Sequence, residues 1–597
     1  DYAEVHCVLG VALKELGNID DAIACFQAAL KIDPRLVEAR TNLGAAIHDI
    51  FNNCDVLMDS GQFNEALANY QRVLEIDPDF SEAHCNLGLA LEALGKFEDA
   101  VTSYRRALAI KPDFAAAHNN LGLALQSLGK LHDAVASYRR ALEIKPDFAA
   151  ANLNLGNALK DLGQLDAAVE YYRRALEINP GYSDAHSNLL FALNYTGHAP
   201  SYCFEQARRF GHIVADKAAR FSEWQCTAGP ERLRVGLVSG DLYGHPVGFF
   251  LENLLAHLDP SRIELIAYPT HHKQDELTAR IRRYFSAWQP LLGLNDEAAA
   301  HLIHADGVHV LIDLSGHTAH NRLPVFAWKP APVQVSWLGY FATTGMAEMD
   351  YLLADAVGVP EARQAQFTES VWYLPDTRLC FTAPAADLAV APLPAIKNGH
   401  ITFGCFQNLT KVNDGVLELW GKILAALPDA TLRLQCKQFS EPSLAAQLLQ
   451  RLQRHGIDPA RVAIHGSARR EDYLAAHAEV DMILDTFPYP GGTTTCEALW
   501  MGVPTLTLAG DSLLARQGAS LLGAAGLSDW VANSREAYVA KAIALASDLP
   551  GLARLRAGLR AQVLTSPLFD APRFARHFEQ ALWGMWQRHH EQQGKPA

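Results

Sequence analysis

The sequence lacks the long apolar runs of a membrane protein, since no stretch of 18 or more residues is both uncharged and apolar. Its first residues, Asp1-Tyr2-Ala3-Glu4, contain neither an initiator Met nor a signal peptide, so we expect a cytoplasmic protein whose start has been trimmed. The ten cysteines include no C-x-x-C pair. We therefore predict buried free thiols rather than a zinc site or a disulfide framework.

Positive charge is also scarce. The chain has 51 Lys and Arg residues against 66 Asp and Glu residues, a net charge of −15, and no run of basic residues. This balance excludes nucleic acids and anionic membranes as expected partners. The 597 residues, of which 49% are hydrophobic, instead predict a folded protein of about three to six domains.

Several catalytic motifs are missing. The sequence contains no G-x-S-x-G, no P-loop and no H-E-x-x-H, which excludes the commonest hydrolases and ATPases. The one D-x-D, Asp77-Pro78-Asp79, lies at a repeat boundary, so the usual carboxylate pair that holds a metal against a nucleotide diphosphate is absent. We expect no metal and no cofactor, and a helix dipole with a lysine would have to supply the positive charge.

The first third of the chain is repetitive. Residues 79–112, 113–146 and 147–180 are consecutive 34-residue units with apolar residues at helical spacing on both sides of a Gly, which predicts two helices per unit. They resemble the tetratricopeptide repeat, whose units stack into a superhelical solenoid. Between Pro34 and Pro78 the spacing is 44, so ten residues are added near 47–60, and we predict a lengthened or bulged helix there.

Asparagines recur at one position of five units, and in a solenoid their amides would form a row. An Asn side chain both donates and accepts hydrogen bonds, so such a row can clamp an extended peptide, although consensus repeats can also simply reuse a tolerated polar position. We predict peptide binding. The residues are Asn42, Asn86, Asn120, Asn154 and Asn188.

After Arg232 the pattern changes to short β-branched runs that alternate with helical stretches. The expected strands are 233–239, 263–268, 308–314 and 333–338, then, after a Pro- and Ala-rich stretch at 382–394, 401–406, 431–436, 462–465, 482–485 and 505–508. This alternation predicts two doubly wound α/β lobes with the ligand in the cleft outside the carboxyl ends of the strands.

These patterns predict five regions. They are a repeat solenoid (1–196), a helical joint (197–230), an N-terminal lobe (231–394), a C-terminal lobe (395–571) and a last helix (572–597). In that helix Phe574, Phe578, Leu582 and Trp586 are spaced by four, so we expect an apolar stripe packed on one of the lobes.

The segment 485–500 carries the clearest chemistry, because a buried strand ends there and a glycine-rich turn opens a helix. Unpaired N–H groups at a helix N-terminus attract phosphate, Gly491 and Gly492 permit close backbone approach, and Thr493 and Thr494 add hydroxyl donors. Glu497, one turn later, is placed to accept from a ribose. An ordinary strand-to-helix turn capped by threonine is the alternative.

Two further side chains follow predicted strands. Lys411 follows the strand 401–406, and its ammonium is suited to a leaving phosphate, although most single lysines are merely solvated. His245 follows the strand 233–239 at a helix start, where it could take a proton or orient a hydroxyl, or could simply cap the helix.

The motifs HPVGFF, DGVHVLIDLSGHT, APVQVSWLGY, LTKVND, LDTFPYPGGTTT and SPLFD occur in this order after the repeats. Together they resemble the protein O-linked N-acetylglucosamine transferase family in its bacterial form, over nearly the whole chain. The resemblance implies a GT-B glycosyltransferase that moves N-acetylglucosamine from UDP to Ser or Thr hydroxyls of proteins, with inversion and without metal.

The resemblance also implies roles for individual residues. His245 matches a cleft histidine proposed as base or acceptor organiser, Lys411 the essential diphosphate lysine, and Asn408 an amide beside the diphosphate. Ala468 and Arg470 match the stretch that holds the uracil, and His304 matches a second cleft histidine. The full expected UDP-sugar set is Asn408, Lys411, Ala468, Arg470, Tyr473, Gly491, Gly492, Thr493, Thr494 and Glu497.

Some positions depart from the animal members of that family. Tyr473 and Gly492 replace histidines, Glu497 replaces an aspartate, and Thr410 replaces a tyrosine, which leaves the sugar preference open. A GDP-fucose-dependent protein O-fucosyltransferase, as in similar plant proteins, is one alternative. A catalytically weak peptide-binding scaffold is the other.

Overall fold

The computed structural model describes residues 2–593, which form two compact units. One unit contains the residues up to Asp161 together with Glu170–Pro180, and the other contains Leu162–Val169 together with the residues from Gly181 onward. Within the described range, no helix is both long enough and apolar enough to cross a membrane. All ten cysteines are free thiols, as predicted, but only seven are buried, and Cys25, Cys203 and Cys226 are half-buried.

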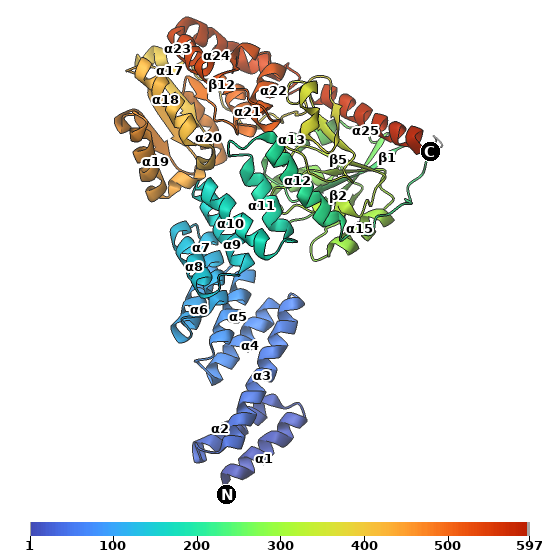
Figure 1. Cartoon of the computed structure of the whole chain (residues 1–597), viewed down its shortest axis with the longest axis vertical. Coiled ribbons are helices and arrows are strands. Elements are labelled where there is room, and N and C mark those ends of the chain that lie inside the picture. Colours follow the sequence, from blue (N-terminus) through green and yellow to red (C-terminus); the bar gives the residue numbers. More distant parts are fainter. Residues whose placement is uncertain (1, 594–597) are drawn as a thin grey trace. The chain divides into compact units, whose positions relative to one another are not determined.

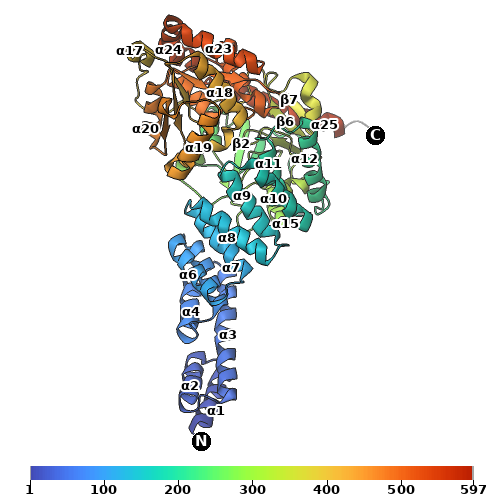
Figure 2. The same cartoon turned by 60° about the vertical axis from the view of Figure 1, so that its left-hand side comes forward.

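Helices α1 to α8 form four antiparallel pairs, and each helix from α1 to α9 packs on the next (Figure 1). The helices are α1 (Tyr2–Glu15), α2 (Ile19–Ile32), α3 (Val37–Asp59), α4 (Phe63–Ile76), α5 (Ser81–Ala93), α6 (Phe97–Ile110), α7 (Ala115–Ser127), α8 (Leu131–Ile144), α9 (Ala149–Asp161) and α10 (Leu165–Ile178). Helix α3 has 23 residues against 13 or 14 in the others, which confirms the predicted lengthening (Figure 2).

A glycine–tyrosine contact repeats inside the helix pairs. A Cβ added at Gly88, Gly122 or Gly156 would lie 2.5 Å from the ring of the tyrosine 16 residues later, so only glycine permits this approach. Gly44 occupies the same repeat position, but nothing lies within 4 Å of its Cβ direction, because α3 is lengthened. The close contact of a glycine with a ring, also made by Gly10 and Phe26 at 2.6 Å, therefore marks the regular repeats, whereas Tyr70 is buried in the lengthened pair without it.

Helices α11 (Ser183–Leu193) and α12 (Pro200–Ala215) belong to the second unit. The Ser187 hydroxyl lies 3.1 Å from His317 Nδ1, and Asn194 donates to the Tyr340 hydroxyl at 3.1 Å. These contacts tie α11 to the first lobe, so the second unit begins before residue 196, where the sequence placed the end of the solenoid.

The first lobe is a seven-stranded parallel sheet of order β3-β2-β1-β4-β5-β6-β7. Its strands are β1 (Leu233–Ser239), β2 (Ile263–Pro269), β3 (Ala287–Trp288), β4 (Val310–Asp313), β5 (Val333–Ser336), β6 (Tyr351–Ala354) and β7 (Ser370–Tyr373), and its helices are α13 (Pro246–His257), α14 (Glu276–Arg282), α15 (Asp296–Ala305) and α16 (Leu323–Ala327). The sequence missed β3, β6 and β7, which are short strands toward the two edges.

The second lobe is a six-stranded parallel sheet of order β10-β9-β8-β11-β12-β13. Its strands are β8 (Thr402–Cys405), β9 (Thr431–Gln435), β10 (Val462–His465), β11 (Met482–Leu484), β12 (Thr505–Leu508) and β13 (Val531–Ala532). Its helices are α17 (Pro394–Asn398), α18 (Asp414–Ala426), α19 (Pro442–Arg454), α20 (Arg470–Ala475), α21 (Thr493–Trp500), α22 (Gln517–Ala524), α23 (Arg535–Ser547) and α24 (Leu549–Leu564). Both sheets have the predicted doubly wound form.

The last helix, α25 (Ala571–Gln593), returns to the first lobe and lies beside its sheet, although it follows the second lobe in sequence (Figure 1). The four residues of its predicted apolar stripe are all buried, and the Phe578 ring lies 4.8 Å from that of Trp337, just after β5. Glu579 accepts from the Asp259 N–H at 2.7 Å. The two lobes are therefore joined twice by the chain.

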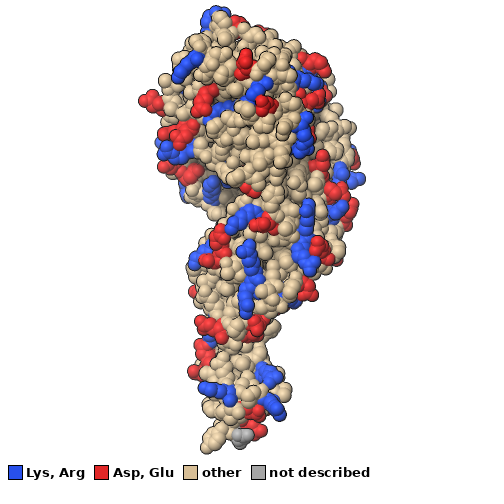
Figure 3. Space-filling view, turned by 90° about the vertical axis from the view of Figure 1, so that its left-hand side faces the viewer, with Lys and Arg blue, Asp and Glu red and all other residues tan. Residues whose placement is uncertain are grey.

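The molecular face shown in Figure 3 carries Lys and Arg side chains interspersed with Asp and Glu side chains. Many of the basic side chains are paired, as in the ion pairs of Arg106 with Asp79 at 3.2 Å and of Lys111 with Glu82 at 3.0 Å.

Candidate active site

The candidate site lies where the strand order of the second lobe reverses. Strands β8 and β11 are neighbours there, and the loops 406–411 and 485–492 follow their carboxyl ends. Ligands of doubly wound sheets bind outside the carboxyl ends at such a switch point. The fold thus brings Lys411 to the glycine-rich turn, which we define as residues 485–492.

The glycine-rich turn is held in place by a buried carboxylate. Asp485 accepts from the N–H of Gly491 at 2.8 Å and from the Thr507 hydroxyl at 2.9 Å, and burial raises its pKa to about 6. A Cβ at Gly491 would lie 2.4 Å from the Thr495 hydroxyl, so the backbone there has no room for a side chain. Helix α21 begins directly afterwards, and the N–H groups of its first turn have no partner within the helix.

Lys411 points its ammonium at this turn. Its Nζ donates to the carbonyl of Pro490 and to Oε1 of Gln407, both at 3.1 Å, and lies 3.9 Å from the centre of the Tyr489 ring. Burial lowers the pKa of Lys411 to about 8, although Asp485 opposes the shift. The site therefore holds an ammonium whose hydration is largely replaced by carbonyl, amide and ring contacts.

The amide beside Lys411 belongs to Gln407 rather than to Asn408. Gln407 is buried, and its Nε2 also donates to the Thr494 hydroxyl at 2.7 Å, which links the two loops. Asn408 is exposed, because the short 3₁₀ turn Leu409–Lys411 begins directly after it and turns it outward. The sequence placed the amide one residue too late, and no pattern after β8 indicates Gln407, because residues 402–407 are all buried.

Residues expected around a nucleoside gather at one side of α21. Glu497 is buried and forms an ion pair with Arg470, and burial raises the pKa of this carboxyl. The guanidinium of Arg470 lies 4.9 Å from the ring centre of Phe249 in the first lobe. The half-buried Tyr473 ring meets Phe406 edge-on at 5.6 Å. Ala468 is exposed in the loop between β10 and α20.

His245 lies at the corresponding switch point of the first lobe, in the loop between β1 and α13. It is the N-cap of α13, and its Nδ1 lies 3.4 Å from the N–H of Val247 and 3.5 Å from Oδ2 of Asp241. Burial, with a smaller effect of Lys273, lowers the pKa of His245 to about 4. A neutral imidazole therefore stands one turn before Phe249, which faces Arg470 of the second lobe.

The prediction that His304 is a second cleft histidine is wrong. His304 lies at the C-terminal end of α15, with Nε2 2.8 Å from the Glu223 carbonyl and its ring stacked on Phe221 at 4.0 Å. The carbonyl of Asp306, two residues after His304, accepts a hydrogen bond from the side chain of Arg234 at the start of β1. His304 therefore lies at the amino edge of the sheet, opposite the edge that carries His245.

The repeat asparagines connect neighbouring repeats. The side-chain N–H₂ groups of Asn42 and Asn120 lie 3.8 Å from the sulfurs of Cys7 and Cys85, and Asn154 donates to Oδ1 of Asn119 at 3.0 Å, each partner being 35 residues earlier. Asn86 hydrogen-bonds Tyr70 of the preceding pair. All are half-buried, and Asn188 belongs to the second unit.

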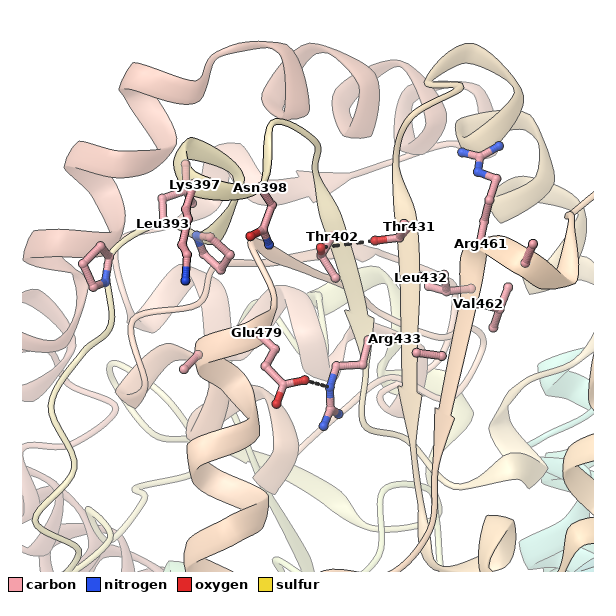
Figure 4. A pocket seen from close by; sticks show the side chains of 15 residues that line it. Leu393, Lys397, Asn398, Thr402, Thr431, Leu432, Arg433, Arg461, Val462 and Glu479 are labelled. Atoms are coloured by element: carbon pink, nitrogen blue, oxygen red, sulfur yellow. Dashed lines mark hydrogen bonds and ion pairs between the residues drawn. The ribbon is translucent and has the colours of Figure 1, made fainter.

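A pocket of about 610 Å³ lies at the opposite edge of the second sheet from Lys411. Thr402 and Thr431, the first residues of β8 and β9, line it and are joined by a 3.2 Å hydrogen bond (Figure 4). Arg433 is paired there with Glu479 at 2.8 Å. This pocket is remote from the switch point and contains none of the residues expected to bind a nucleotide.

No three His, Cys, Asp or Glu side chains within residues 2–593 are grouped so that they could hold a metal ion. The charged groups of this site are Asp485, within the glycine-rich turn, and Lys411, whose ammonium donates to the carbonyl of Pro490.

Comparison with known proteins agrees with this architecture. The family model for glycosyl transferase family 41 matches residues 192–382 and 393–578, and models for tetratricopeptide repeats match 3–36, 55–95, 91–129 and 119–183. A solved structure of a Thermobaculum terrenum O-GlcNAc transferase mutant is similar, with a TM-score of 0.80 and 35% identity over 86% of this chain and 98% of that one.

Two curated relatives are also similar to this chain in sequence. The Solanum lycopersicum "Probable UDP-N-acetylglucosamine--peptide N-acetylglucosaminyltransferase SPINDLY" is 37% identical over 67% of this chain and 44% of its own length. The Caenorhabditis elegans "UDP-N-acetylglucosamine--peptide N-acetylglucosaminyltransferase" is 26% identical over 65% and 43%, so the chain spans less than half of either relative. Since the family model covers more than half of the residues, the chain belongs to glycosyl transferase family 41.

Proposed function

We propose that the chain transfers N-acetylglucosamine from UDP-N-acetylglucosamine to Ser or Thr hydroxyls of proteins, with inversion at the anomeric carbon and without a metal ion. The observation that carries the proposal is the convergence of Lys411 and the glycine-rich turn at the switch point of the second lobe. In addition, the names of the relatives and of the similar solved structure describe such transferases.

In the proposed reaction the donor diphosphate lies on the N-terminus of α21. The acceptor hydroxyl attacks the anomeric carbon from the face opposite UDP, and the bond from that carbon to the β-phosphate oxygen breaks. The negative charge that grows on the leaving phosphate is stabilised by the ammonium of Lys411 and by the free N–H groups and hydroxyls of Thr493 and Thr494.

The acceptor proton has a suitable recipient in His245. A base must be unprotonated before the reaction, and the low pKa of His245 keeps its imidazole neutral near pH 7. For Nε2 to take that proton, Nδ1 must carry the ring hydrogen and donate to the Asp241 carboxylate, 3.5 Å away, instead of accepting from the N–H of Val247. Water and a phosphate oxygen are the alternative proton acceptors. Only transfer to His245 requires that kcat/KM fall at acidic pH, so a pH profile distinguishes His245 from both.

The repeats serve as the protein-substrate module in this proposal. The half-buried amides of Asn42, Asn86, Asn120 and Asn154 each use one hydrogen bond to fix the neighbouring repeat, and an Asn side chain can make more than one. We propose that their remaining capacity binds the backbone of an extended peptide. The five regions defined from the sequence are then the functional modules of the chain.

The test is incubation of the purified chain with a Ser/Thr-containing peptide mixture and either UDP-N-acetylglucosamine or GDP-fucose, followed by mass spectrometry. N-acetylhexosamine on Ser or Thr supports the proposal. Fucose from GDP-fucose alone establishes the alternative donor. Binding of peptide without transfer from either donor establishes a scaffold.

A further inference from the structure

A second buried cation lies beside the proposed donor site. Arg378, in the segment that follows β7 of the first lobe, is 1% exposed. Its Nη2 donates to Oε1 of Gln517 at 2.9 Å, but among residues 2–593 nothing accepts a hydrogen bond from its Nε or Nη1, although both atoms are buried. Buried guanidinium groups are ordinarily satisfied, so this one requires an explanation.

Within the described part of the chain, no carboxylate accepts a hydrogen bond from this guanidinium. Asp355 is close enough to attract the charge, but its Oδ2 accepts from the backbone N–H of Arg378 at 3.0 Å and from the Ser520 hydroxyl at 2.7 Å. Arg556 shows the usual pattern, because it is equally buried and its three side-chain nitrogens donate to the carbonyls of Ala391, Val480 and His477.

The position of Arg378 connects it to the glycine-rich turn. Gln517, which accepts from Arg378, donates to the carbonyl of Gly491 at 3.3 Å, and its Nε2 lies 3.0 Å from where a Cβ of Gly492 would be. Arg378 also interacts electrostatically with Tyr489. The ammonium of Lys411 lies 3.9 Å from the centre of the Tyr489 ring. Two cations from different lobes therefore flank the same turn.

We propose that Arg378 is a positioning residue that favours the bound diphosphate of the donor, by holding Gln517 against the glycine-rich turn and by placing a second positive charge behind it. In a buried environment of low dielectric a charge acts over several ångströms with little screening. The incoming anion adds to the partial compensation by Asp355 of a cation whose own hydrogen bond goes to a neutral amide. The inference rests on the proposed function only in taking a nucleoside diphosphate as the ligand.

The experiment compares UDP and uridine binding by calorimetry in the full chain and in two neutral variants, Arg378→Met and Arg378→Gln. We expect at least a tenfold loss of UDP affinity and an unchanged uridine affinity in both. Arg378→Lys, which keeps the charge, should remain within about threefold of the unsubstituted chain. The unliganded melting temperature of Arg378→Met should not fall, since the variant removes an unpaired buried charge.

Arg556→Met is the matched control, because it removes a satisfied buried guanidinium away from the turn. It should lower the melting temperature and leave UDP affinity unchanged in the folded fraction. UDP affinity that is undiminished in the neutral Arg378 variants, or that falls equally for uridine, would overturn the role of Arg378. If Arg378→Met does not fold, Arg378→Gln gives the same comparison.

The two proposals fail in distinguishable ways. If the unsubstituted chain binds GDP but not UDP, the donor proposed above is wrong, and the Arg378 comparison is made with GDP against guanosine. If it binds no nucleoside diphosphate, both proposals are overturned.

Discussion

Replacement of Lys411 by Met removes the ammonium that the proposed mechanism places beside the leaving phosphate. Its Nζ lies 3.1 Å from the Pro490 carbonyl, within the turn that precedes α21. Two unit charges about 4 Å apart interact by about 4 kcal/mol at an effective dielectric constant of about 20. Loss of that interaction in the transition state corresponds to roughly a thousandfold decrease in kcat.

The same variant should fold as well as the unsubstituted chain, because burial disfavours the charged lysine and lowers its pKa to about 8. The assay is single-turnover transfer from the active donor to a peptide, with thermal unfolding measured in parallel. Lys422→Met is the control, since Lys422 is exposed on α18 and paired with Glu418 at 2.6 Å. A Lys411→Met rate within tenfold of the control would refute the charge argument.

Further predictions concern pH and three glycines. The value of kcat/KM should fall below about pH 4, because His245 is then protonated and cannot act as a base. It should also fall above about pH 8, because Lys411 then loses its charge. If water or a phosphate oxygen takes the proton instead, the decrease at acidic pH should be absent and the decrease at alkaline pH should remain. Because a bound diphosphate favours the charged lysine, the alkaline limb of kcat should lie at higher pH than that of kcat/KM. Gly491→Ala should weaken UDP binding in calorimetry, since its Cβ would displace three polar side chains at 2.4–2.7 Å, and unchanged affinity would contradict the close approach. Gly122→Ala should lower stability by about 1–3 kcal/mol in chemical unfolding, because its Cβ would meet a tyrosine ring, whereas Gly44→Ala, at the same repeat position in open space, should raise it by up to about 1 kcal/mol.

The sequence predicted those parts of the fold that depend on local periodicity. The 34-residue spacing indicated the helix pairs, the ten added residues indicated the long α3, and the β-branched runs indicated nine of the thirteen strands that the described residues contain. Strands β3 and β13 escaped prediction because each has only two residues, and β7 escaped it because it is incompletely buried. Strand β6 was missed although it is fully buried and as long as β4 and β5.

The sequence could predict the site residues that lie in turns directly after strands. It could not predict those whose position depends on the tertiary structure. Lys411 and the glycine-rich turn follow strands, so their meeting at one sheet edge could be anticipated. The exchange of Gln407 for Asn408 depends on a 3₁₀ turn that no pattern indicates, and His304 was misplaced because a family resemblance does not show which end of α15 faces the cleft. Arg378 resembles any surface arginine until its burial is known.

The central claim is that the donor diphosphate sits on the N-terminus of α21 beside Lys411. A crystal structure of the chain with UDP tests it directly. The account predicts phosphate oxygens within hydrogen-bond distance of Lys411 Nζ and of the backbone N–H groups of Thr493 and Thr494. A pyrophosphate bound elsewhere, with Lys411 still directed only at Gln407 and Pro490, would contradict it.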